Sequence, residues 1–304
     1  MNDKGVVEKY DRALREYANE VLPGFWNELK NQRRPFQPFL DKLFGFYLYC
    51  LYLTDSNLFH NDEKYPSLNI RYVKACLALF GIHNCLQYGL VTESAVLLRS
   101  LFESYLFESY LNVKLILQKD TEERIGLFHD FRYVERWNSL QANKNLLEEG
   151  KISKEIFDRT FTSDLIKKIE DNYLSVKSNY HPKHPYHWAW KIFRNETKNQ
   201  RNPSIHFIAD KLGLSADCIK VYGPLSVSVH NSPSLLNLVL TGNAITLAPN
   251  FSRSIYNIGC LSLGYLSDLI EDLVNYLEFG EPGEISTYLS IFWIRTCNED
   301  QGAG

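Results

Sequence analysis

The sequence predicts an all-α fold, a multi-helix bundle that forms a single domain over residues 1–304. Apolar residues recur at spacings of three and four along most of the chain, which is the period of a helix with one buried face. Apolar residues make up 45% and charged residues 23% of the sequence, as in ordinary globular proteins. A chain of 304 residues is long enough to bury a large core.

The predicted core helices occupy about residues 5–147 and 251–297. Those of the first part are expected at 5–31, 38–54, 69–89, 92–118 and 120–147. The first ends before Pro35, and Gly89 is a typical C-cap for the third. Thr92 can cap the fourth helix, whose apolar surface is almost continuous, as in a central helix. Asp120 and Glu123 resemble a capping box for the fifth.

Residues 179–250 are predicted to form a small irregular insertion, because Pro182 and Pro185 interrupt the helical pattern. Strand-like runs around a Gly-Asn pair at 238–247 are compatible with one short β-hairpin. The remaining helices are expected at 153–161, 163–176, 187–199, 204–212, 216–230, 251–279 and 284–297.

Charge and apolar runs limit the classes of partner. The formal net charge of −3 gives no global attraction to nucleic acid, so such binding requires a local basic patch. The most membrane-like run, Leu43–Leu53, is about half the roughly 20 residues that a spanning helix needs. We interpret it as a core helix and expect no membrane partner. The sequence leaves open whether the protein forms a homo-oligomer or binds a protein partner.

The six cysteines contain no CxxC pair, and most lie among apolar residues, as small core side chains do. The N-terminus lacks the pattern of a secretory signal and leads directly into a charged amphipathic segment. A reducing, cytoplasmic location is therefore expected.

Arg99 and Glu103 are four residues apart in an apolar helix, so they share a helix face. Buried charges are costly unless they are paired, and they often lie at functional sites. The alternative is that the two residues satisfy one another as an intrahelical ion pair with no further role.

A second polar constellation combines Ser226 and His230, again four residues apart, with Tyr222 one turn earlier and Asn231 directly after. Histidine is suited to proton transfer near neutral pH, and the serine is a possible nucleophile or substrate contact. No GxSxG elbow is present, and the alternative is a histidine that is hydrogen-bonded within the core.

Four cations at helical spacing, Lys191, Arg194, Lys198 and Arg201, follow Trp188 and Trp190. Cations beside aromatic rings are used to hold single-stranded nucleic acid, so this face is a candidate RNA contact. The alternative is a solvated helix face whose tryptophans are anchored in the core. The nearby run His181, His184 and His187 has no Cys, Asp or Glu within it and is interrupted by prolines. No metal and no cofactor are predicted.

The R-x-x-x-E helix at Arg99 and the Y-x-x-x-S-x-x-x-H helix ending at His230 resemble a large, all-helical bacterial family known only as a domain of unknown function. The resemblance covers about residues 90–235 and implies a site without an assigned reaction. A looser likeness is to HEPN-type helical ribonucleases of toxin and antiviral systems, in which an Arg precedes a His by four to six residues on one helix. No Arg precedes His230 at that distance, so only Arg99 from the other helix can take this place.

Two hypotheses follow. In the first, the protein is a metal-independent enzyme acting on RNA, with His230 as acid/base, Arg99 holding a phosphate and Glu103 orienting Arg99. Ser226, Tyr222 and Asn231 then contact the substrate. In the second, the protein is a non-catalytic binding or assembly module, and the same residues form a buried polar network that fixes the register of the helices.

Overall fold

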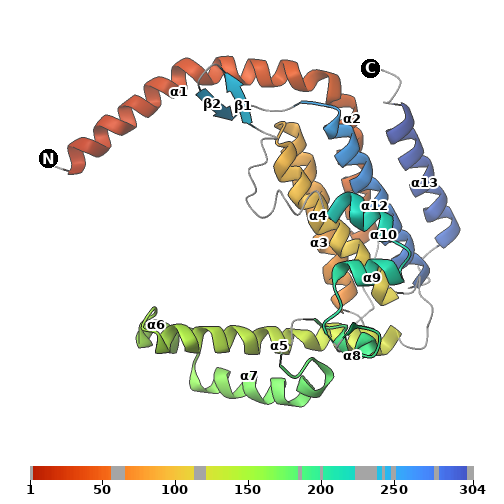
Figure 1. Cartoon of the computed structure of the whole chain (residues 1–304). Coiled ribbons are helices and arrows are strands. Elements are labelled where there is room, and N and C mark those ends of the chain that lie inside the picture. Colours follow the sequence, from red (N-terminus) through yellow and green to blue (C-terminus); the bar gives the residue numbers. More distant parts are fainter. Residues whose placement is uncertain are drawn as a thin grey trace. The chain divides into compact units, whose positions relative to one another are not determined.

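The computed structural model confirms the all-α fold class (Figure 1). It describes residues 3–55, 66–112, 121–183, 187–198, 201–222, 238–241, 244–247, 251–276 and 281–299. The backbone divides into two compact units, and the single domain stays a prediction. The first unit contains Met1–His60, Tyr72–Tyr105 and Val221–Gly304, and the second contains Asn61–Arg71 and Leu106–Lys220.

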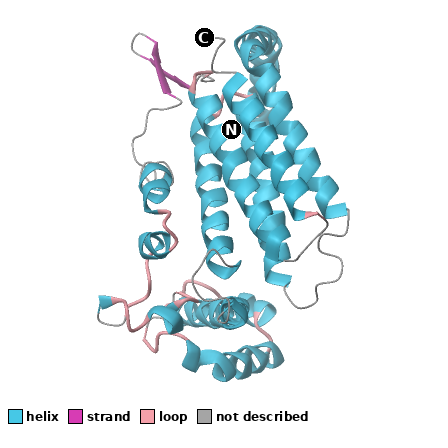
Figure 2. Cartoon of the chain, turned by 90° about the vertical axis from the view of Figure 1, so that its right-hand side faces the viewer, coloured by secondary structure: helices cyan, strands magenta, loops and turns pink. Residues whose placement is uncertain are grey.

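Long helices make up most of the first unit (Figure 2). They are α1 (Asp3–Arg33), α2 (Gln37–Asp55), α12 (Ser254–Tyr276), α13 (Pro282–Glu299) and most of α3 (Pro66–Gln87) and α4 (Val91–Asn112), with a short η1 (Arg34–Phe36) between α1 and α2. Gly89 follows α3 with φ of 66°, the left-handed conformation of a glycine C-cap. The boundary between the units falls inside α3 and α4, so each of these helices contributes to both units.

Aromatic rings join α2 to its neighbours in the first unit. The ring of Phe46 lies 5.2 Å from that of Phe292 on α13, and the ring of Tyr47 lies 4.9 Å from that of Phe80 on α3. The Tyr72 hydroxyl donates to the Cys50 carbonyl oxygen at 2.7 Å, which satisfies a buried polar group between α3 and α2. These contacts pack α2 between α3 and α13.

Gly259 on α12 permits a close approach to α2. A Cβ atom at this position would lie 2.5 Å from two ring carbons of Phe39, which is almost fully buried and packs against Tyr256. Gly45 on α2, in contrast, is exposed, and a Cβ atom there would meet nothing within 4 Å. The two helical glycines therefore differ only in the space around them.

Alanine substitutions at these two glycines are expected to change stability in opposite directions. Gly45→Ala should raise the free energy of unfolding by roughly 0.5–1 kcal/mol, because alanine favours the helix. Gly259→Ala gains the same helical preference but should lower stability by about 1–3 kcal/mol, because the Phe39 ring is overpacked. Urea denaturation of both variants tests this, and equal midpoints would show that the Phe39 ring yields without cost.

The second unit contains α5 (Thr121–Glu148), α6 (Lys154–Thr160), α7 (Ser163–Val176), η3 (Lys177–Asn179), α8 (Trp190–Phe193), α9 (Ile205–Lys211), α10 (Ser215–Asp217) and the start of η5 (Cys218–Tyr222). Helices α6 and α7 confirm the prediction, and the side chains of Ser153 and Thr162 cap them as expected for these residue types. Trp137 of α5 stacks on Tyr173 of α7 at 4.7 Å, beside a core cluster that includes Leu140 and Phe157.

The predicted hairpin is present as β1 (Leu238–Thr241) paired antiparallel with β2 (Ala244–Leu247). Leu238 is opposite Leu247, and Thr241 is opposite Ala244. The predicted Gly-Asn pair between the two strands lies outside the described residues.

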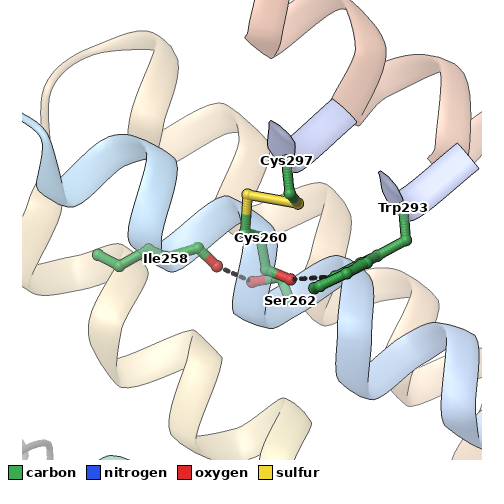
Figure 3. Close-up of a disulfide and its surroundings, with 5 residues drawn as sticks. All are labelled: Ile258, Cys260, Ser262, Trp293 and Cys297. Carbon is green, nitrogen blue, oxygen red and sulfur yellow. Dashed lines mark hydrogen bonds between the residues drawn. A yellow bond between two sulfur atoms is a disulfide. The ribbon is translucent and has the colours of Figure 1, made fainter. Parts of the chain in front are cut away.

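A disulfide joins Cys260 of α12 to Cys297 of α13, which the sequence does not predict (Figure 3). The Trp293 indole N–H, one turn before Cys297, donates to the Cys260 carbonyl oxygen at 3.4 Å. The free thiols of Cys50, Cys76 and Cys218 are buried, as expected for core side chains. Disulfides persist in oxidising compartments, so the cytoplasmic location stays a prediction.

Candidate functional site

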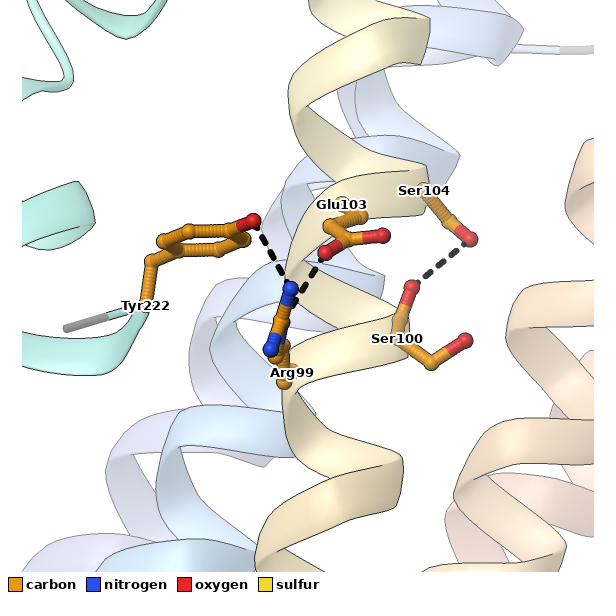
Figure 4. A network of polar contacts seen from close by, with 5 residues as sticks. All are labelled: Arg99, Ser100, Glu103, Ser104 and Tyr222. Atoms are coloured by element: carbon orange, nitrogen blue, oxygen red, sulfur yellow. Dashed lines mark hydrogen bonds and ion pairs between the residues drawn. The ribbon is translucent and has the colours of Figure 1, made fainter. Parts of the chain in front are cut away.

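Helix α4 carries the centre of the candidate site. Arg99 and Glu103 are one turn apart on the same face, and Arg99 Nε donates to Glu103 Oε1 at 3.0 Å (Figure 4). The side chain of Arg99 is 13% exposed and that of Glu103 is 30% exposed. The pair is therefore neither fully buried nor a surface ion pair, and Glu103 connects it to solvent.

Tyr222, at the end of η5, approaches the same guanidinium from outside α4. Arg99 Nη2 donates to the Tyr222 hydroxyl at 2.7 Å, and Arg99 Cζ lies 4.2 Å from the centre of the tyrosine ring (Figure 4). The contact joins residues 123 positions apart in the sequence. Glu103 and Tyr222 thus hold two of the three guanidinium nitrogens, and we call the three residues the Arg99 cluster.

The third guanidinium nitrogen is buried without a hydrogen-bond partner in the part of the chain that the structure describes. This atom is Arg99 Nη1. A buried donor left unsatisfied costs about 1–3 kcal/mol, so a position with such a donor favours an acceptor. The Arg99 cluster thus holds a guanidinium in a fixed orientation, and its Nη1 donor is available to bind an acceptor.

Three predicted site residues, Ser226, His230 and Asn231, lie outside the described residues. Tyr222 is the first residue of their motif, one helical turn before Ser226 in the sequence. The structure therefore brings the R-x-x-x-E motif to the first residue of the Y-x-x-x-S-x-x-x-H motif. The closeness of Arg99 and His230 stays a prediction.

A family of unknown function, DUF5677, matches residues 70–244, which is more than half of the chain. The chain belongs to DUF5677. This membership confirms the resemblance to a domain of unknown function, and the DUF5677 region includes every predicted site residue. No curated protein and no solved structure matches the chain, so the likeness to HEPN-type ribonucleases has no support from either.

The prediction of one helix over 187–199 is wrong. The prediction that Lys191, Arg194, Lys198 and Arg201 share one helix face is therefore wrong as well. Helix α8 ends at Phe193, and turns follow it. Lys191 forms an ion pair with Glu123 at 2.9 Å, and the Arg194 guanidinium lies 5.6 Å from the centre of the Trp190 ring. The side chains of Arg194, Lys198 and Arg201 are exposed.

Both tryptophans of this segment are buried, so they cannot present open faces to nucleobases. Trp188 packs edge-on against Phe107 at 5.4 Å and against Phe128 at 5.2 Å. The alternative, tryptophans anchored in the core, is the observed one. The sequence pattern was misleading because short helices depend on packing more than on spacing.

The proline-rich histidine run makes backbone contacts where it is described. His187 Nδ1 accepts from the Ala189 N–H at 3.1 Å, and burial lowers the pKa of His187 to about 4. His181 Nδ1 accepts from the Lys183 N–H at 3.2 Å. Among the residues that the structure describes, no group of three or more His, Cys, Asp or Glu side chains could hold a metal ion.

One feature of the second unit was missed by sequence reasoning. The Arg71 guanidinium is buried, with Cζ 3.9 Å from the ring centre of Phe128 and 5.1 Å from that of Phe107. Such cation–π contacts stabilise a cation that has left bulk water. An arginine inside the apolar pattern of α3 was the available signal.

None of the described helices combines sufficient length with sufficient apolar character to cross a bilayer.

Proposed function

We propose that the Arg99 cluster is the phosphate-binding part of a site that acts on RNA. The observation that carries this proposal is the arrangement of Arg99, whose Nε and Nη2 are engaged by Glu103 and Tyr222 while Nη1 has no partner among the described residues. Guanidinium groups suit phosphate oxygens in charge and in hydrogen-bond geometry. Fixing two nitrogens in advance reduces the entropy lost when the third binds a ligand.

The proposed chemistry is a phosphodiester cleavage in which His230 is the general base. The imidazole accepts the proton of a ribose 2′-hydroxyl, and the 2′-oxygen attacks phosphorus to form a 2′,3′-cyclic phosphate as the bond to the 5′-oxygen breaks. The 5′-oxygen takes a proton from water, and the imidazolium returns its proton to the resulting hydroxide. Arg99 stabilises the charge on the phosphate oxygens, and Glu103 orients Arg99. Ser226, Tyr222 and Asn231 are proposed substrate contacts. The association with toxin or antiviral-defence systems rests on the looser family resemblance alone.

Substrate binding beyond this site is proposed for Arg194, Lys198 and Arg201, which are exposed cations. Lys191 is a weaker candidate because Glu123 neutralises it.

The second candidate function is a non-catalytic binding or assembly module. The observation that favours it is the same ion pair, because Glu103 already neutralises Arg99. The Tyr222 contact then ties η5 to α4 and fixes their register, as a buried polar network does. Under this hypothesis, Arg99 contributes to stability and RNA has no specific site.

The function is tested by Arg99→Lys, which keeps the positive charge and removes the planar fork of donors. The affinity for a short single-stranded RNA, measured by fluorescence anisotropy at low salt, should fall at least tenfold, or about 1.4 kcal/mol. The matched control is Arg132→Lys, because Arg132 makes a similar contact with Tyr133, donating from Nη2 to the hydroxyl at 2.8 Å. Arg132 is exposed and far from the motif in sequence, so its variant should bind as the wild type does.

Two results contradict the proposed function. The first is a wild-type protein that does not bind RNA at low ionic strength, where phosphate contacts are strongest. The second is an equal effect of the two lysine substitutions on RNA affinity. Either result, combined with a lower melting temperature for Arg99→Lys alone, favours the structural role.

A further inference from the structure

Helices α2 and α3 present an apolar surface in the first unit that the core does not use. On α2 the surface consists of Phe44, Leu48 and Leu51, and on α3 it consists of Val73, Leu77 and Phe80. These six residues, which we call the α2/α3 face, are between 37% and 57% exposed. Soluble monomers rarely expose so many large apolar side chains together.

The six residues form one surface because the two helices touch along it. The Tyr47 ring stacks on Phe80 at 4.9 Å, and the Phe44 ring lies 5.2 Å from that of His83. Spacings of three and four put each set of three on one side of its helix. Tyr52, which is 64% exposed, extends the α2 stripe by one further position.

The run at 43–53 explains why this face exists. The core buries Leu43, Phe46 and Cys50 of this run, in agreement with the predicted core helix. A helix that is apolar on all sides is normally buried on all sides. The side that the core of this unit does not cover therefore requires another apolar partner. No charged residue occurs on α2 between Lys42 and Asp55, so this second side has no polar character of its own.

We infer that the α2/α3 face binds the same face of a second copy of this chain, forming a two-fold symmetric dimer. Six large apolar side chains, each more than a third exposed, supply the apolar centre of an interface, around which the ~800 Å² that each partner contributes to an ordinary stable interface can be completed. A two-fold axis parallel to the helices sets α2 of one copy on α3 of the other.

Charge complementarity supports this arrangement over a membrane surface. Lys74 lies exposed beside Val73 and Leu77, and Asp55 is exposed at the end of the α2 stripe. In the two-fold arrangement Lys74 faces the partner's Asp55, and the reciprocal pair forms as well. Membrane-surface helices carry several Lys and Arg residues beside their apolar side. Here Lys74 is accompanied by two exposed carboxylates at the ends of the α2 stripe, Asp41 and Asp55, which anionic headgroups repel.

Light scattering and sedimentation equilibrium of the full chain test the dimer. The wild type should have twice the 35.4 kDa mass of the chain at micromolar concentration. Leu48→Glu and Leu77→Glu each put two charges into one dimer interface, and each should raise the dissociation constant at least tenfold. Leu174→Glu on α7, at a position with 55% exposure, is the matched control and should leave the dimer intact.

Charge reversal tests the arrangement itself. Lys74→Glu and Asp55→Lys should each weaken the dimer, and the combined variant should recover most of the lost affinity. Circular dichroism and thermal melting of each variant establish that the chain is still folded. A wild type that is monomeric at all concentrations overturns the inference, as does a dimer that Leu48→Glu and Leu77→Glu leave unchanged. Sedimentation of the monomer with phosphatidylserine vesicles would assign the face to a membrane surface instead.

Discussion

The His230→Ala variant is expected to cleave RNA about a hundredfold more slowly than the wild type, the usual scale for the loss of a general acid or base. Alanine removes the only side chain that the proposed chemistry uses for proton transfer. It retains the Arg99 cluster, so RNA should still bind with nearly unchanged affinity. The measurements are single-turnover cleavage of a labelled RNA and the binding constant of the same RNA.

Glu103→Gln is the companion variant that separates a catalytic site from a structural network. Glutamine keeps the shape of the side chain and can still accept the hydrogen bond from Arg99 Nε, but it removes the charge. For a fully buried pair, the loss of one charge costs about 3–5 kcal/mol. The Glu103 side chain is 30% exposed, and Tyr222 also binds Arg99, so we expect a cost nearer to 1 kcal/mol.

The two hypotheses therefore predict different combinations of RNA-cleavage rate and melting temperature for these variants. For a catalytic site, His230→Ala loses cleavage with an unchanged melting temperature, and Glu103→Gln loses more activity than its small loss of stability explains. For a structural network, both variants lose stability and function in step. That second pattern would falsify the catalytic hypothesis.

Local helical signals predicted much of the fold. The expected helices at 38–54 and 69–89 correspond to α2 (Gln37–Asp55) and α3 (Pro66–Gln87), because apolar periodicity and the Gly89 cap are properties of the segments themselves. Helix α8 could not be predicted in this way. The two tryptophans at this helix are buried, and Trp188 packs against Phe107 and Phe128 from distant parts of the chain. Such tertiary packing, rather than residue spacing, decides the extent of a short helix.

The candidate site likewise contains one contact that the sequence predicts and one that it does not. The Arg99–Glu103 ion pair follows from a spacing of four residues, which any helix brings to one face. The contact between Arg99 and Tyr222 spans 123 positions and depends on the tertiary arrangement of α4 and η5. In the sequence alone, only the resemblance to a family with both motifs connects these residues.

The disulfide between α12 and α13 was also beyond the reach of sequence patterns. Its cysteines are 37 residues apart and have no CxxC signature, and each lies in an apolar helix like the free cysteines. Pairing depends on the geometry of the two helices, whose Cα atoms at these positions are 5.8 Å apart, within the usual range for a disulfide.

Removal of this disulfide is expected to lower the free energy of unfolding by about 3–4 kcal/mol, because the bond closes a long loop in the unfolded chain. The reduced wild type and the Cys260→Ala/Cys297→Ala variant should both show the effect in urea denaturation. The native fold should persist after reduction, since the Trp293 indole N–H still bonds the Cys260 carbonyl oxygen and Leu289 stays buried.

Reductant added to the double alanine variant is the control and should not change its denaturation midpoint, which separates the disulfide from general effects of the reductant. Thiol titration of the denatured protein gives the independent count. Four of the six cysteines are free thiols, so four should react before reduction and six after it. Six reactive thiols in the unreduced protein would show that α12 and α13 are held by packing alone, and reduction would then leave stability unchanged.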